Sequence, residues 1–163
     1  MTKNSVMVVM HPREVLREVL FERTCDLARY LKDIESAELR SRQTTSKGLI
    51  RCVHHWRARI DVPSLLAPHI DAGFLEWTGY TEWRADQYES RWVVKPRYLK
   101  DSALCEANMR LVPAVGGRGT RVELELEVLR LNGPAGMQAI TSTILTTHFR
   151  KLVEAAARLI EDQ

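Results

Sequence analysis

Hydrophobic residues recur at every second position through the middle of this chain, and at every third or fourth position near its end. The clearest alternation is in residues 122–128, where four aliphatic side chains alternate with three glutamates. A period of two is typical of a β-strand with one buried and one solvated face. The pattern therefore predicts that sheet dominates the middle of the molecule and that a helix closes it.

Seven segments have the composition or the alternation of strands. They are residues 5–10, 34–44, 49–60, 75–84, 88–95, 103–112 and 119–131. Turn residues at Ser46-Lys47-Gly48 and at Gly116, Gly117 and Gly119 predict two tight hairpins. Residues 61–73 contain two prolines, which predicts a loop with one helical turn at 64–67.

Helical spacing occurs in two regions. After the first strand, His11-Pro12 begins one short helix, and residues 25–32 form a second with Thr24 as its predicted N-cap. After Asn132-Gly133-Pro134 the helical pattern continues to the end of the chain, which predicts a helix of about 28 residues, or about 40 Å. Because no repeat or linker interrupts these patterns, residues 1–163 are predicted to form a single domain.

Composition narrows the class of protein. The chain is 45% hydrophobic and 28% charged, as ordinary globular proteins are, and its net charge of +3 is scattered, so no nucleic-acid partner is expected. No apolar run approaches the roughly 20 residues that span a bilayer, so no membrane insertion is expected. The short apolar run near the N-terminus is too brief for a secretory signal, which predicts a cytoplasmic protein. Three widely spaced cysteines fit neither a disulfide framework nor a zinc motif.

Three features together resemble a known superfamily. They are the opening V-M-V-V-M-H-P-R-E-V-L-R-E-V-L, the hairpin M-R-L-V-P-A-V-G-G-R-G-T-R-V-E-L-E-L-E, and the long closing helix. With them the chain resembles the START-like (SRPBCC) superfamily, whose helix-grip fold also occurs in the birch-pollen-allergen proteins. It is most similar to bacterial members without an assigned function.

The resemblance implies an α+β fold: a curved seven-stranded antiparallel sheet, two short helices after the first strand, and a long C-terminal helix packed across the sheet. It also implies an apolar cavity for a lipid, polyketide or other ring-containing ligand between sheet and helix. Some members are cyclases or hydrolases and others are carriers or protein-binding domains, so the fold leaves function open.

Two histidines are the candidate reactive groups. His54 falls on the apolar face of its strand, and His148 on the inner side of the last helix. Each could orient a ligand or act as a general base, or it could be a hydrogen-bonded core histidine. Two histidines are too few for zinc, which takes at least three protein ligands, so neither a metal nor a cofactor is expected.

Apolar and hydroxyl side chains complete the predicted ligand site. Four tryptophans fall on the predicted inner phase of their strands, where they could line a groove for a ring-containing ligand or simply fill the core. Thr141, in a hydroxyl-rich part of the last helix, could bind a ligand's polar end, or these hydroxyls could bond backbone carbonyls. The predicted ligand-binding residues are His54, Trp56, Trp77, Trp83, Trp92, Met109, Thr141, Leu145, His148 and Leu152.

Charged residues gather on the predicted outer face of the sheet. They are Arg40, Arg42, Arg51, Arg57 and Arg59 on the second and third strands, and Glu123, Glu125 and Glu127 on the seventh. These residues could pair with opposite charges across neighbouring strands. Alternatively, they could form a docking face for an acidic partner or an anionic membrane surface.

The motifs G-x-S-x-G, H-E-x-x-H and a phosphate-binding loop do not occur in the sequence. Three functions remain: a carrier of a small hydrophobic ligand, a cyclase-like or hydrolase-like enzyme that uses a cavity histidine, and an interaction module with a collapsed cavity. The last would take a protein partner or a second copy of the chain.

Overall fold

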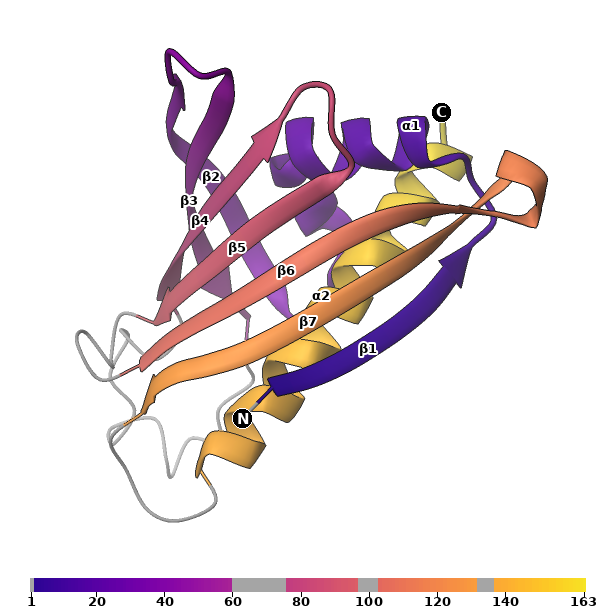
Figure 1. Ribbon diagram of the computed structural model, residues 1–163. Coiled ribbons are helices and arrows are strands. Elements are labelled where there is room, and N and C mark those ends of the chain that lie inside the picture. The colour runs from indigo at the N-terminus through magenta and orange to yellow at the C-terminus, as the bar shows by residue number, and fades with distance from the viewer. Residues whose placement is uncertain (1, 60–75, 97–102, 132–136) are drawn as a thin grey trace.

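The computed structural model describes residues 2–59, 76–96, 103–131 and 137–163. Its strands are β1 (Thr2–Val9), β2 (Ile34–Thr44), β3 (Leu49–Ala58), β4 (Glu76–Arg84), β5 (Glu89–Pro96), β6 (Ala103–Ala114) and β7 (Gly119–Leu131). They form one antiparallel sheet in the order β1-β7-β6-β5-β4-β3-β2 (Figure 1). The predicted seven-stranded sheet is confirmed, with two strands at open edges.

The helices lie on one side of this sheet. A short helix α1 (Arg13–Arg17) continues as a π-helical turn η1 (Glu18–Glu22), and a 3₁₀ segment η2 (Thr24–Tyr30) follows. The 25-residue helix α2 (Met137–Glu161) runs along the inner face of the sheet (Figure 1). The prediction of Thr24 as an N-cap is wrong, because its hydroxyl turns back and donates to the carbonyl of Leu20 at 2.8 Å.

Alternate residues of β3 to β7 point toward α2, as the period of two predicted. One row across the inner face runs through His54, Gly79, Val94, Cys105 and Val128. The β6–β7 hairpin turns through a short 3₁₀ segment, η6 (Val115–Gly117), in which Gly116 and Gly117 take positive φ angles of 65° and 87°. These conformations favour glycine, so the predicted reversal is confirmed.

Strand β2 departs from the predicted alternation. Its register against β3 shifts between Leu39 and Ser41, which is a bulge with one extra residue in β2. Beyond the bulge every side chain changes face, so Arg42 lies on the inner side, where its guanidinium pairs with Glu22 at 2.5 Å. The predicted outward placement of Arg42 is therefore wrong.

The C-terminal half of α2 is packed closely against the sheet. Leu152, Ala156 and Leu159 are fully buried there. A void of about 10 Å³ lies between this part of the helix and the sheet, next to Phe149 and Val153. Such a space holds about one water molecule, so this void is too small for an organic ligand.

Some predictions fall outside the described residues. They are the loop at 61–73 with its helical turn at 64–67, the break at 132–134, and the side chain of Thr141. Among the helices that the structure describes, none combines the length and the apolar character needed to cross a membrane.

Candidate functional site

Aromatic rings meet where α2 passes β3 and β4. The indoles of Trp56 and Trp77, paired across these two strands, stack with ring centroids 6.0 Å apart and planes 2° from parallel. The imidazole of His148 on α2 stands edge-on to both, at 5.8 Å from Trp56 and 5.6 Å from Trp77. These three rings, which we call the ring wall, combine residues almost 100 positions apart in the chain.

A glycine determines where the Trp56 indole lies. Gly79 is paired with His54 across β3 and β4, and a Cβ atom on it would lie 3.2 Å from Nε1 of Trp56. The indole therefore leans over a position that carries no side chain. The imidazole of His54 lies two residues before Trp56 on the same face of β3, and the two ring centroids are 6.5 Å apart.

Both histidines are neutral at pH 7. His54 is 5% exposed, and this burial lowers the pKa of its imidazole. Burial also lowers the pKa of His148 to about 4, with a smaller contribution from the positive charge of Lys151. A neutral imidazole has one N–H donor and one acceptor nitrogen.

Neither imidazole has a proton-transfer partner in the described part of the chain. No hydrogen bond joins His54 or His148 to another described residue, and none pairs them with a carboxylate. General acid–base catalysis needs a partner or a substrate proton within hydrogen-bond reach. The described residues also contain no group of three histidine, cysteine or acidic side chains that could hold a metal ion.

The ring contacts continue along α2 to β5. Phe149 lies edge-on to His148 at 5.8 Å and to Trp92 at 5.7 Å. The indole N–H of Trp92 donates to the hydroxyl of Ser90 at 2.7 Å, which satisfies its only polar atom. Sequence reasoning placed Trp92 on the inner face but did not include Phe149, whose role depends on how α2 is rotated against the sheet.

Trp83 lies apart from the ring wall. Its ring is 1% exposed and packs against Phe21 at 5.8 Å, below the guanidinium of Arg42. All four tryptophans thus take the predicted inner phase. The structure brings Trp56, Trp77 and Trp92 into one set of ring contacts and leaves Trp83 in the core beside η1.

The remaining predicted site residues divide by burial. Met109 and Leu152 are 1% exposed and belong to the closed core, whereas Leu145 is partly buried on α2. The hydroxyl of Thr146 donates to the carbonyl of Ser142 at 2.7 Å, so the backbone-bonding interpretation is confirmed for this residue. Ser142 itself is 2% exposed, and its hydroxyl has no hydrogen-bond partner among the described residues.

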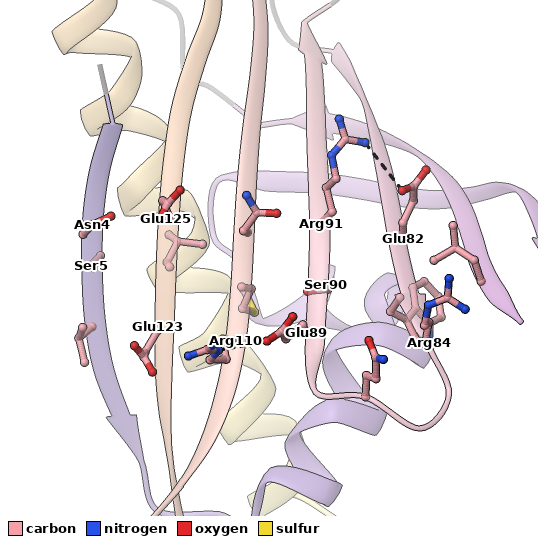
Figure 2. Close-up of a pocket in the computed structure, with 17 residues that line it drawn as sticks. Asn4, Ser5, Glu82, Arg84, Glu89, Ser90, Arg91, Arg110, Glu123 and Glu125 are labelled. Carbon is pink, nitrogen blue, oxygen red and sulfur yellow. Dashed lines mark hydrogen bonds and ion pairs between the residues drawn. The ribbon is translucent and has the colours of Figure 1, made fainter. Parts of the chain in front are cut away.

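A second hollow lies on the outer face of the sheet. This groove has a volume of about 650 Å³ and crosses β1, β7, β6, β5 and β4, and Figure 2 shows the side chains that line it. Its labelled side chains are polar or charged, and Arg91 reaches toward Glu82 at 3.8 Å. Arg110 pairs with Glu89 at 3.1 Å in the same groove.

Ion pairs account for most of the charge on this outer face. Arg51 pairs with Glu82 and Arg57 with Glu76, each at 3.1 Å across β3 and β4. Arg40 pairs within its own strand, with Glu38. The predicted cross-strand pairing is thus confirmed for two arginines, and the groove presents side chains of both charges.

Comparisons with known proteins place the fold. No family model and no curated protein matches the sequence. Among solved structures, the chain is similar to the Zhui aromatase/cyclase from Streptomyces sp. R1128, with a TM-score of 0.70 and 11% identity over 99% of this chain and 93% of that one. It is similar to a START superfamily protein from Mycobacterium smegmatis, with a TM-score of 0.63 and 11% identity over 99% and 97%.

A further similar structure is norcoclaurine synthase from Thalictrum flavum in complex with dopamine and hydroxybenzaldehyde. Its TM-score is 0.65 and its identity 11%, over 100% of this chain and 87% of that one. At these identities the likeness shows a shared fold, and the function must be argued from the residues of this chain.

Proposed function

We propose that this chain, which has the helix-grip fold of START-like proteins, binds a small hydrophobic ligand with a flat ring system against the ring wall of Trp56, Trp77 and His148. The single observation that carries the proposal is this wall itself: two stacked indoles with an imidazole edge-on to both. Aromatic faces and edges favour further stacked or edge-to-face rings at about 4.5–7 Å between centroids.

The position of the wall supports binding. The other half of α2 is closed, with a void of about 10 Å³, whereas Trp77 and His148 keep partial exposure. A wall of large rings with accessible edges beside a closed core is the arrangement expected of an apolar ligand site.

Binding is favoured over catalysis by the state of the histidines. The described residues provide no carboxylate or hydroxyl in hydrogen-bond contact with His54 or His148. The low pKa of His148, about 4, also makes it a poor general base near pH 7. We therefore propose a carrier or binding protein. The similarity to an aromatase/cyclase is a similarity of fold.

Native mass spectrometry and organic extraction of the protein purified from its own cells test this proposal. We expect a bound apolar molecule that is lost from Trp77→Ala and retained by Trp83→Phe, a matched change of a tryptophan outside the ring wall. A ligand-binding function would be contradicted if the wild type and both variants show only the mass of the ligand-free protein and the wild type does not bind naphthalene in equilibrium dialysis.

A further inference from the structure

The hydroxyl of Ser142 is a buried polar group without a described partner. Ser142 is 2% exposed, yet its Oγ makes no hydrogen bond to any described residue. A buried hydroxyl normally has a partner, because an unpaired one loses its hydrogen bonds to water on folding. A polar atom from outside the chain would supply the missing hydrogen bond.

The helix determines which way Ser142 faces. Phe149 is seven residues later, two turns along the same side of α2, and packs against Trp92 on the sheet. Thr146, between them on this side, is also buried. Ser142 therefore faces the sheet, whereas Thr143, one position on, is turned toward the β1 edge and accepts a hydrogen bond from Lys3 at 3.4 Å.

Ser142, Leu145 and His148 follow one another at intervals of three residues along α2. Ser142 precedes His148 by six residues, which is roughly 9 Å along the helix axis and about 120° around it. The space on the other side of Phe149 is closed by Met109, Val122 and Val153. A flat ligand stacked on the wall therefore reaches Ser142 by extending past Leu145, which is partly buried.

The charge of the inner face restricts the ligand. Both histidines are neutral at pH 7. Arg42, which the bulge in β2 turns inward, already pairs with Glu22 and covers Trp83. Among the described residues no charged side chain on the inner face is left to pair with an ionised ligand, and an unpaired buried charge is strongly disfavoured.

The geometry points to Ser142 as a specificity-determining residue: its hydroxyl hydrogen-bonds an oxygen of an uncharged ring compound whose rings lie on Trp77 and His148. This inference rests on the proposed function and adds to it the ligand's polarity and the residue that reads it. A hydroxyl can donate to a carbonyl or accept from a phenol, so either oxygen fits.

Equilibrium dialysis at pH 7 with three matched probes tests this inference. The probes are naphthalene, 2-naphthol and 2-naphthoate, which share one ring system and differ in having no oxygen, an uncharged oxygen or a charged group. We expect Ser142→Ala to weaken 2-naphthol binding about 3- to 10-fold, as loss of one hydrogen bond does, and to leave naphthalene binding unchanged. We expect 2-naphthoate to bind weakest to the wild type.

Thr146→Ala is the matched control, because it removes a hydroxyl one turn away that is already bonded to a backbone carbonyl. It should leave the ratio of the 2-naphthol and naphthalene affinities unchanged, and Ser142→Ala should fold, since alanine favours a helix. Equal effects of Ser142→Ala on both probes, or 2-naphthoate binding as tightly as 2-naphthol, would overturn the inference. Naphthalene binding that is absent, or unaffected by Trp77→Ala, would instead refute the proposed function.

Discussion

The neutral, partly buried imidazole of His148 makes a definite prediction about how stability depends on pH. An unfolded histidine has a pKa of about 6.5, whereas burial holds the pKa of His148 at about 4 in the folded protein. Between these values the unfolded chain binds a proton that the folded protein excludes. The free energy of unfolding must therefore decrease as the pH falls from about 6.5 to about 4, and this contribution is constant above and below that window.

The two pKa values set the size of the effect. The linkage relation gives at most about 2 kcal/mol for the loss of unfolding free energy that His148 causes between pH 8 and pH 5. Because the His148 side chain keeps partial exposure, we expect about 1–2 kcal/mol. His54 also has a lowered pKa and acts in the same direction, so the contribution of His148 has to be isolated with variants.

Urea unfolding at pH 8, 6.5 and 5 measures this contribution. His148→Phe retains an aromatic ring beside Trp56 and Trp77 but cannot bind a proton, so its stability should fall less between pH 8 and pH 5 than that of the wild type, by about 1–2 kcal/mol. His148→Asn is also uncharged at every pH and should show the same smaller loss, whatever its absolute stability. If all three proteins lose equal stability between pH 8 and pH 5, the imidazole is not held neutral by burial and the reasoning fails.

Three further changes test individual contacts. Gly79→Ala places a methyl group 3.2 Å from Nε1 of Trp56, so we expect a cost of about 1 kcal/mol in urea unfolding, weaker naphthalene binding and an altered near-ultraviolet circular dichroism spectrum. Ser90→Ala removes the acceptor of the buried Trp92 N–H and should cost about 1–3 kcal/mol of unfolding free energy; an unchanged midpoint would show that the bond contributes nothing. Leu152→Ala opens a cavity in the closed core, which should lower the free energy of unfolding by about 2–5 kcal/mol. Under conditions in which the variant is fully folded, its affinity for naphthalene should stay the same.

Alternation along the sequence was sufficient to predict the sheet and its inner face. Strands with one buried face repeat every second residue, which placed Trp56, Trp77 and Trp92 correctly. Arg42 was misplaced because a bulge adds one residue to β2 and no composition signal marks it. A bulge is fixed by pairing with the neighbouring strand, so it becomes visible only when both strands are present.

The candidate site was predictable only in part. The period of the last helix put His148 on its inner side, and the structure brings it to Trp56, the neighbour of His54. The importance of Gly79 could have been suspected, because a glycine inside a strand often marks the close approach of another group. The lack of a partner for the Ser142 hydroxyl could not be predicted from the sequence, because it depends on which atoms surround this hydroxyl in the folded chain.

Helix α2 combines two roles because its two ends meet different surroundings. Its C-terminal half is fixed by buried leucines and by polar contacts at its end, including the hydrogen bond from Tyr30 to Asp162 at 2.7 Å. That anchoring holds the rotation of the whole helix, since a helix is rigid over this length. His148 is therefore aimed at the indoles, and Ser142 at the sheet, by packing that lies several turns away. The proposed ligand site needs no catalytic group to be specific, because a fixed helix, a wall of rings and one unpaired hydroxyl would select a ligand's shape and polarity.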